Sequence, residues 1–402
     1  MTAPFSASDR PTIRLRPKTD ARRIRHGFPW AYANEVVTDR RTKALAPGAL
    51  AVLEDENRVA LGLAAVNPAS KIFARIVDRD VAAAVDQDWF ARRLSRALAL
   101  RTQLFDAPNY RLIHAEADGL PGVVIDRFGD ILVIQPNAAW ADVHLDALAS
   151  AAAAVTGATV ILKNASGRAR GLEGLDDAHA VLRGAAPAGP VPVPMNGATY
   201  MADVMGGQKT GLFFDQRPNH AFARNLAQDA RVLDVFSHVG GFGLAALAGG
   251  AQSALCVDAS APALDLAAQG AAAMGMAEQL ETRQGDAFQV LTDLGTAGET
   301  FDLVVCDPPA FAPAKSALDA GLRAYERVAR LAAPLVTPGG ILGLCSCSHA
   351  ADLARFRTAS ARGIGRAGRD AALIHTGFAG PDHPLLPQLA ESGYLKALFF
   401  RL

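Results

Sequence analysis

The sequence predicts an α/β protein whose C-terminal half is a doubly wound, mostly parallel sheet. Two smaller domains precede this sheet, the first rich in β-strands and the second α+β. Three observations predict this fold. Strand-like and helix-like segments alternate after about residue 197, the first 78 residues form short apolar runs broken by turn signals, and 402 residues exceed one ordinary domain. We expect domains at 1–78, 79–186 and 187–402.

Composition narrows the class of protein. Half of the residues are hydrophobic, which is enough for full cores, and no run reaches the ~18 apolar residues that a membrane helix needs. The first residues lack an apolar signal core, and the four cysteines form no C-x-x-C pair. We therefore expect a cytoplasmic protein with reduced thiols, no membrane segment and no metal site.

The N-terminal strands are "TIRLR", "ALAVLED", "VALGLAAV" and "KIFARIVD", separated by Pro47-Gly48 and Asn67-Pro68. The whole chain has 40 basic and 40 acidic residues, but the start of this domain is strongly basic. Asp20 is the one acid among seven basic residues there: Arg10, Arg14, Arg16, Lys18, Arg22, Arg23 and Arg25. Such a cluster is typical of a phosphate-binding surface, although a solvated basic face would have the same composition.

The middle of the chain predicts a helix over about 87–105, a hairpin that turns at Phe128-Gly129-Asp130, and an Ala-rich helix over about 138–155. The Pro- and Gly-rich stretch 183–197 is predicted as a linker or irregular crossing. In the last domain the predicted strands are "RVLDVF", "SALCVD", "LETRQ", "FDLVVCD" and "ILGLCS". Helices are expected over "LAALAGG", after Ser260 and over about 318–336, and "AALIHTG" with "GYLKALFFRL" predicts a terminal antiparallel pair.

Ligands of an open α/β sheet bind beyond the carboxyl ends of its strands. In this chain the predicted strands end at Asp234, at Asp258, near Asp286, at Asp307 and at Cys345–Cys347. Stability alone gives no reason to gather four acids and two thiols at one edge. The sequence therefore predicts a functional site there.

The glycine loop after the first strand admits two cofactors. Gly241, Gly243 and Ala246 match G-x-G-x-x-A, the dinucleotide fingerprint. However, Asp234 immediately before the loop would repel a pyrophosphate, and "DPP" after the fourth strand has no role in hydride transfer. S-adenosylmethionine (SAM) carries an ammonium and a sulfonium group and suits this acidic edge better. The pattern therefore favours methyl transfer.

Five motifs in this order carry a family resemblance: "DGLPGVVIDRFG", "GGQKTGLFFDQRPN", "DVFSHVGGFGLAAL", "VVCDPPAF" and "CSCSH". Together with "ARRIRHGFPWAYANE" they resemble the bacterial 23S rRNA 5-methylcytosine methyltransferases over nearly the whole chain. The resemblance implies an RNA-binding PUA β barrel, a central α+β domain and a class I, Rossmann-like methyltransferase domain with a seven-stranded sheet. It also implies SAM as cofactor and rRNA of the large subunit as partner, and it allows a homodimer.

The resemblance assigns roles to individual residues. The S-C-S of the family falls on Ser346–Ser348, so Cys347 is the expected nucleophile that adds to cytosine C6, with Asp307 holding the base. The expected cofactor-binding residues are Asp234, Phe236, Gly240, Gly241, Gly243, Asp258, Ala259, Asp286, Ala287 and Asp307. The expected RNA-binding residues are Arg22, Arg23, Arg25, Lys209, Arg217 and Phe311, the last as a wall for a flipped ring.

Two alternatives stay open. Ala310 follows Pro309, where many RNA 5-methylcytosine enzymes have a second cysteine, so the base that removes the C5 proton is not identified. "DPPAF" could instead bind an exocyclic or purine nitrogen as the methyl acceptor. A non-catalytic rRNA-binding assembly factor would not need the four acids. Cys256, Cys306 and Cys345 are expected to be core residues.

Overall fold

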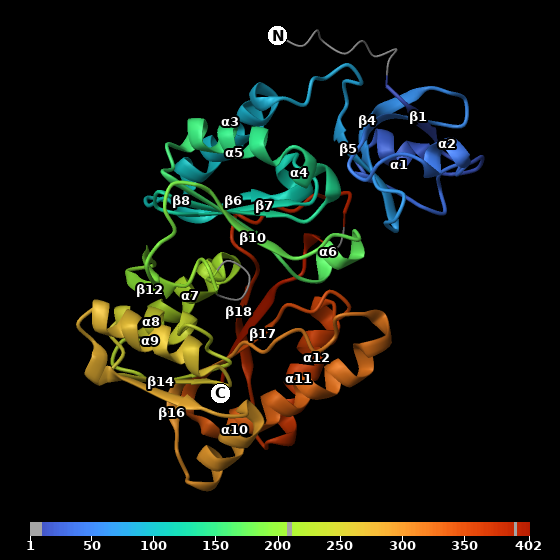
Figure 1. Ribbon diagram of the computed structural model, residues 1–402. Coiled ribbons are helices and arrows are strands. Elements are labelled where there is room, and N and C mark those ends of the chain that lie inside the picture. The colour runs from blue at the N-terminus through green and yellow to red at the C-terminus, as the bar shows by residue number, and fades with distance from the viewer. Residues whose placement is uncertain (1–9, 207–210, 390–391) are drawn as a thin grey trace. The chain divides into compact units, whose positions relative to one another are not determined.

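The computed structural model describes residues 10–206, 211–389 and 392–402 (Figure 1). By its contacts the chain forms two compact units. Unit 1 contains the described residues up to Ala188 and the segment that begins at Asp382. Unit 2 contains most of the chain from Gly189 to Pro381 together with Gly393–Leu402. The predicted boundary at residue 78 lies inside unit 1 and stays a prediction.

The first sheet of unit 1 has the order β1-β3-β4-β5-β2, with β1 parallel to β3 and the other pairs antiparallel. It confirms the β-rich N-terminal domain, and the short strand β2 was not predicted. The elements are β1 (Thr12–Arg14), α1 (Ala21–Arg25), β2 (Trp30–Tyr32), α2 (Arg40–Lys43), β3 (Leu50–Glu54), β4 (Ala60–Val66) and β5 (Ile72–Asp78).

The second sheet of unit 1 has the order β10-β9-β8-β7-β6. The predicted hairpin is confirmed, since β7 and β8 pair antiparallel up to Phe128 opposite Ile131. The predicted Ala-rich helix is two helices that meet at His144. The elements are α3 (Gln87–Leu104), β6 (Asn109–His114), β7 (Val123–Phe128), β8 (Ile131–Pro136), α4 (Ala139–Val143), α5 (Leu145–Thr156), β9 (Val160–Ala165), α6 (Arg168–Leu172) and β10 (Ala178–Arg183).

Part of the predicted linker is regular structure. β11 (Val191–Met195) and β12 (Ala198–Ala202) form an antiparallel two-stranded sheet. The prediction of an irregular stretch is therefore wrong for 191–195. Prolines suggested a loop there, but β11 pairs with β12 alone, and a strand with an open edge tolerates residues that lack a backbone donor.

Unit 2 is built on a seven-stranded sheet in the order β15-β14-β13-β16-β17-β19-β18. The first five strands are parallel and β19 is antiparallel to both neighbours, which confirms the mostly parallel sheet and the terminal antiparallel pair. The elements are α7 (Arg217–Asn225), β13 (Arg231–Val235), α8 (Gly241–Ala248), β14 (Ser253–Asp258), α9 (Ala261–Ala273), β15 (Leu280–Gln284), α10 (Ala287–Thr296), β16 (Phe301–Cys306), α11 (Leu318–Ala332), β17 (Val336–Ser346), α12 (Leu353–Arg366), β18 (Ala372–Gly377) and β19 (Lys396–Arg401).

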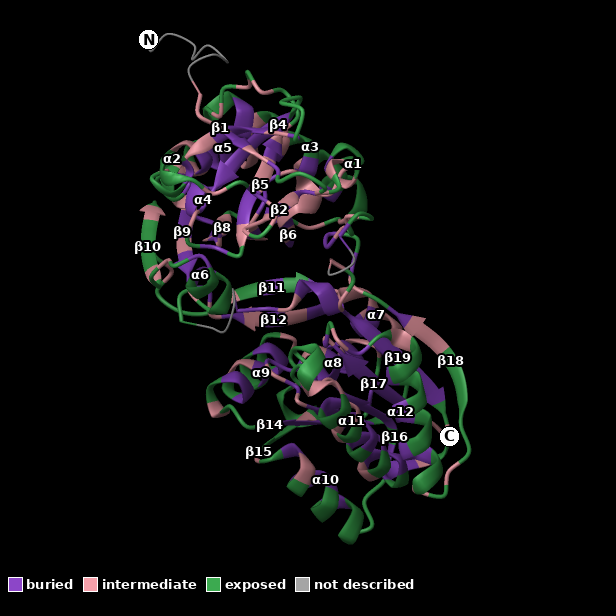
Figure 2. Ribbon diagram, turned by 90° about the vertical axis from the view of Figure 1, so that its right-hand side faces the viewer, coloured by how far each residue is buried: buried purple, intermediate pink, exposed green. Residues whose placement is uncertain are grey.

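Helices cover the sheet of unit 2 in two groups. α7, α8 and α9 contact one another or the β11–β12 hairpin, whereas α10 and α12 both contact α11. The central strands are buried while the outer faces of α11 and α12 are exposed (Figure 2). Parallel strands end at the same edge of a sheet, so the residues that follow β13, β14, β15, β16 and β17 share one edge.

Candidate active site

Asp234 is the next-to-last residue of β13 and is fully buried. Its Oδ2 accepts hydrogen bonds from the backbone N–H groups of Phe242 (3.0 Å) and Gly243 (2.8 Å), in the first turn of α8. Its Oδ1 is also buried and has no hydrogen-bond partner among the described residues. Burial raises the pKa of Asp234 to about 7, against the two backbone bonds that lower it. An unpartnered carboxylate oxygen therefore lies at the edge where the strands end.

The loop between β13 and α8 has an unusual backbone. Phe236 (φ 61°) and His238 (φ 50°) both lie in the left-handed region that side chains with a Cβ rarely adopt, and Gly240 (φ 79°) follows them. Asp258 holds the loop, because its Oδ2 accepts a hydrogen bond from His238 N (2.9 Å) while its Oδ1 accepts one from Ser260 N (2.8 Å). The second acid of the edge thus ties the glycine loop to the start of α9.

The two glycines of the fingerprint are required by the protein's own packing. A Cβ on Gly241 would lie 2.7 Å from Nε2 of His220, and one on Gly243 would lie 2.5 Å from Sγ of Cys256. His220 is buried against the rings of Tyr200 and Phe242, and burial lowers the pKa of this histidine to about 3. A neutral aromatic layer therefore supports the loop from below.

The remaining residues predicted to bind the cofactor lie around the same edge. Asp286 is exposed, and its Oδ1 caps α10 by accepting a hydrogen bond from Gln289 N (3.0 Å). Ala287 is buried in the first turn of this helix, whereas Ala259 is exposed beyond β14 and its carbonyl accepts a hydrogen bond from Gln284.

Asp307 follows β16 and is hydrogen-bonded to a residue that the sequence did not suggest. Nε2 of Gln216 donates to Oδ2 of Asp307 (2.8 Å), and Nδ2 of Asn219 donates to Oε1 of Gln216 (2.6 Å). Both amides are almost fully buried. They come from "FFDQRPN", part of a motif that carries the family resemblance, but no local pattern connects it with Asp307. A carboxylate and oriented amides can together recognise the edge of a planar base.

The four cysteines differ in exposure. Cys256, Cys306 and Cys345 are buried, and burial raises the pKa of each of these thiols. Cys347 is half-exposed and lies one residue beyond β17. A thiol must ionise and reach its substrate to act as a nucleophile. Cys347 meets the second condition, and burial of Cys345 agrees with its predicted core role.

The serines on either side of Cys347 are anchored. Oγ of Ser346 donates to the hydroxyl of Tyr325 (2.9 Å), which also bonds Oγ of Ser348 (2.7 Å). Oγ of Ser348 accepts a further bond from the backbone N–H of Ala312 (2.9 Å), next to Phe311. Side chains alternate along an extended chain, so the serines point to one side and Cys347 to the other. The anchoring fixes the direction of the thiol.

The residues predicted to bind RNA are found in three situations. Arg22 is exposed, whereas Arg23 and Arg25 form ion pairs with Glu35 and Asp55. Arg217 is half-buried with its guanidinium 5.6 Å from the ring centre of Phe214. Phe311 is half-buried among aromatic rings, 5.0 Å from Tyr325 between centroids. Lys209 lies outside the described residues.

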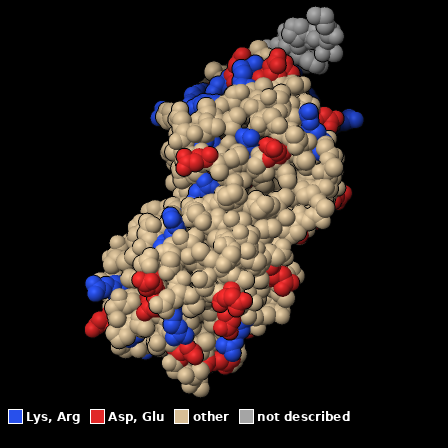
Figure 3. Space-filling view, turned by 90° about the vertical axis from the view of Figure 1, so that its left-hand side faces the viewer, with Lys and Arg blue, Asp and Glu red and all other residues tan. Residues whose placement is uncertain are grey.

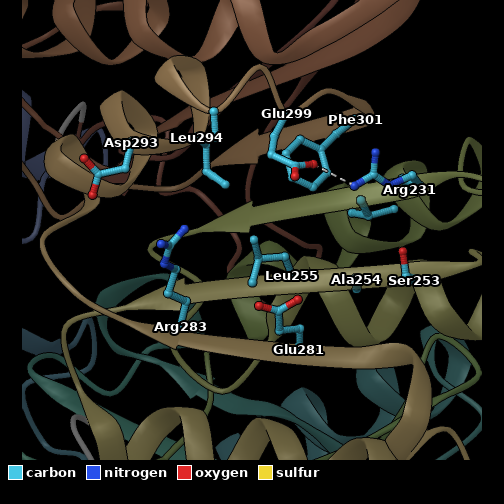
Figure 4. A pocket seen from close by; sticks show the side chains of 12 residues that line it. Arg231, Ser253, Ala254, Leu255, Glu281, Arg283, Asp293, Leu294, Glu299 and Phe301 are labelled. Atoms are coloured by element: carbon cyan, nitrogen blue, oxygen red, sulfur yellow. Dashed lines mark hydrogen bonds and ion pairs between the residues drawn. The ribbon is translucent and has the colours of Figure 1, made fainter.

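A cavity of unit 2 lies away from the edge that holds the four acids. It has a volume of about 420 Å³ and is lined by residues at the amino ends of the strands, including Arg231, Ser253, Glu281 and Phe301 (Figure 4). Arg231 pairs with Glu299 at its rim (3.0 Å). The cavity is at the opposite ends of the strands from the four acids, so it is not part of the candidate active site.

Metal-binding clusters and membrane-spanning helices are both absent from the described residues. Within these ranges, no group of three or more His, Cys, Asp or Glu side chains is arranged to hold a metal ion. No helix in the described part of the chain is both long and apolar enough to cross a bilayer.

A family model described as S-adenosylmethionine-dependent methyltransferase matches residues 140–401. The chain belongs to this family. A model of the PUA-like domain matches residues 13–79. SAM is the cofactor of this family. The buried Oδ1 of Asp234, which has no hydrogen-bond partner among the described residues, lies at the strand ends and fits a ligand that carries an ammonium group.

Curated relatives match nearly the whole length of this chain. Ribosomal RNA large subunit methyltransferase I of Cronobacter sakazakii is 36% identical over 372 residues, which are 92% of this chain and 93% of the relative. The protein of the same name from Shewanella amazonensis is 36% identical over 394 residues, 97% of this chain and 99% of the relative.

The same fold occurs in solved structures. A provisionally assigned SAM-dependent methyltransferase from Streptococcus mutans superposes with a TM-score of 0.81 at 18% identity, over 98% of this chain and all of that one. A provisionally assigned methyltransferase solved in complex with SAH gives the same score, over 98% of this chain and 99% of that chain.

Proposed function

We propose that this methyltransferase forms 5-methylcytosine in rRNA of the large ribosomal subunit, with Cys347 as the nucleophile. The relatives named above support rRNA as the substrate. The observation that carries the chemistry is the exposure of Cys347, the one thiol of the four that is not buried. Cys347 follows β17, and β17 pairs with β16, the strand that leads to Asp307.

The reaction needs a nucleophile because C5 of cytosine is too electron-poor to attack a methyl group unaided. The Cys347 thiolate adds to C6, forming the S–C6 bond and moving electron density onto C5. SAM, when bound, would supply an electrophilic methyl group to C5, with its sulfonium S–CH3 bond breaking and S-adenosylhomocysteine leaving. Removal of the C5 proton by a base then lets the S–C6 bond break, which restores the ring and returns the thiolate. Asp307, held by Gln216, would accept a hydrogen bond from the N4 amine and, when protonated, donate one to N3, with Phe311 stacked against the ring.

The acids at the strand ends would hold the cofactor. Oδ1 of Asp234 suits the ammonium group, Asp258 suits the ribose hydroxyls, and Asp286 suits the adenine amine. Backbone groups of Gly240 and its neighbours line the approach. These assignments are supported by the position of each acid at or just beyond the carboxyl end of a parallel strand.

A covalent trap tests the nucleophile. The protein is incubated with SAM and 23S rRNA that contains 5-fluorocytosine, whose fluorine cannot leave as a proton does. We expect wild type and Cys345→Ala to give a protein–RNA complex that survives denaturing electrophoresis, and Cys347→Ala to give none. Loss of the complex in Cys345→Ala with retention in Cys347→Ala would show that the nucleophile is Cys345 and contradict the proposal.

A second candidate function is methylation of an exocyclic or purine nitrogen. It is favoured by Asp307-Pro308-Pro309, because a carboxylate beside two prolines can accept a hydrogen bond from an amine. In this case Cys347→Ala would keep its activity on unmodified RNA, and wild type would give no trapped complex.

A further inference from the structure

A buried lysine lies beside the proposed nucleophile. Lys396 is the first residue of β19, and its Cα pairs in register with Ser346 of β17. The residue is 5% exposed. Nζ donates hydrogen bonds to the carbonyl oxygens of Ser348 (2.7 Å) and Ala351 (2.7 Å). The ammonium group therefore ties down both ends of the turn that follows Cys347.

The surroundings of this ammonium lack a close carboxylate. No ion pair in the described part of the chain includes Lys396. Its two hydrogen-bond acceptors are neutral carbonyl groups. A buried cation without an anion is costly, and a nearby anion would offset that cost. Two groups that can carry negative charge act on it electrostatically: Cys347, which lies between its register partner Ser346 and its acceptor Ser348, and Asp352 at the start of α12. Asp352 is 57% exposed and caps α12, which leaves Cys347 as the less solvated of the two.

We propose that Lys396 is a positioning residue for the nucleophile: it fixes the turn after Cys347 and supplies the positive charge that stabilises the thiolate. This inference rests on the proposed function, in which Cys347 must ionise. Burial lowers the pKa of Lys396, while the charges of Cys347 and Asp352 raise it. The interaction is mutual, so the charge on Lys396 favours the ionised form of Cys347 by the same amount.

A second anchor of the same turn, which carries no charge, provides a matched control. Tyr325 anchors Ser346 and Ser348 through its hydroxyl, which is neutral, since burial raises the pKa of this phenol. Tyr325→Phe therefore loosens the turn without removing a charge. His349 is exposed, and its ring faces Tyr394 (5.6 Å between centroids). Among the described residues, the titratable groups around this turn include Cys347, Asp352, Tyr325, His349 and Tyr394.

The test measures the alkylation rate of Cys347 by iodoacetamide as a function of pH in the full-length protein. Fragment-ion mass spectrometry separates this thiol from Cys345. Lys396→Gln keeps a hydrogen-bond donor for the turn but removes the charge, and Lys396→Arg keeps the charge. We expect Lys396→Gln to slow alkylation at pH 7 by roughly tenfold and to move the pH midpoint upward, and Lys396→Arg to restore most of the rate.

An exposed substitution guards against a folding defect in the lysine variants. Asp352→Asn keeps a good helix cap and removes the competing negative charge, so it should speed alkylation by about twofold. The proposal would be overturned if Tyr325→Phe changed the pH midpoint as much as Lys396→Gln does. It would also be overturned if Asp352→Asn had no effect and Lys396→Gln left the pH profile of alkylation unchanged. Alkylation requires no RNA, so the two proposals can fail separately. If the covalent trap gives no complex while the alkylation profile still depends on Lys396, the proposed function is refuted and the role of Lys396 is not.

Discussion

At the scale of single residues, Asp234 is an acid of the candidate site whose pKa is strongly raised. It is completely buried, two backbone N–H groups bind one oxygen, and its pKa is raised to about 7. An acid whose folded-state pKa lies above its ordinary value stabilises the fold least when it is ionised, so its contribution to stability is lost as pH rises from about 4 to about 7. A cationic ligand at Oδ1 would recover that loss.

This linkage predicts pH-dependent cofactor binding. If the ammonium group of the cofactor is held by ionised Asp234, the affinity for SAH should rise roughly tenfold between about pH 6 and pH 8, because a proton must leave Asp234 below its pKa of about 7. Isothermal titration calorimetry in buffers of different ionisation heat measures both the affinity and the proton released. Asp234→Asn should bind weakly with no such pH dependence. A pH dependence that persists in this variant would assign the proton to another group.

The positions of candidate site residues were predictable only where they follow from a strand. Asp234, Asp258 and Asp307 each end an apolar run, so the sequence alone indicates that they gather at one edge. Gln216 and Lys396 carry no such signal. Gln216 bonds Asp307 from 91 residues away, and Lys396 bonds Ser348 from 48 residues away. The antiparallel return of β19 creates the second contact, and its register with β17 could not be read from the sequence.

At the scale of elements, α8 and β14 pack too closely to admit one more methyl group. A Cβ on Gly243 would lie 2.5 Å from Sγ of Cys256. Gly243→Ala should therefore lower the free energy of unfolding by roughly 1–3 kcal/mol, despite the better helix propensity of alanine. The double variant with Cys256→Ala should recover most of the loss. Urea denaturation followed by circular dichroism measures both.

Gly365 serves as the matched control for that substitution. It lies in α12, and a Cβ added there would meet no atom within 4 Å, so Gly365→Ala should raise the free energy of unfolding by about 0.5–1 kcal/mol. Equal effects of the two Gly→Ala changes would show that close packing does not explain Gly243.

Elements were predicted well where the sequence contains a long apolar run. β13, β14 and β16 are near-continuous apolar runs between helices, and the predicted terminal antiparallel pair is present as β18 and β19. β11 was missed because Pro192 and Pro194 suggested a loop, although an outer strand of a hairpin accepts them. The break at His144 was missed because alanines on both sides favour helix equally.

At the scale of the whole molecule, charge offers no long-range attraction to RNA. The chain has equal numbers of basic and acidic residues, and on the face in Figure 3 the two signs are interspersed among other residues. Affinity for the proposed rRNA substrate would then have to come from local contacts, for which exposed Arg22 is a candidate. Arg23 and Arg25 are already paired with Glu35 and Asp55, so phosphate would have to compete for them.

This distribution predicts a graded salt dependence. Affinity for a 23S rRNA fragment should fall steeply with salt, and Arg22→Ala should reduce the slope of log K against log salt by about 0.7–0.9, the loss of one phosphate contact. Arg25→Ala should change the slope less, because its guanidinium is shared with Asp55. Filter binding at several salt concentrations measures the slopes. Arg283→Ala, in the cavity at the amino ends of the strands, is the control that should leave the slope unchanged; an equal loss there would mean that RNA binding depends on overall charge and that no basic surface of unit 1 is special.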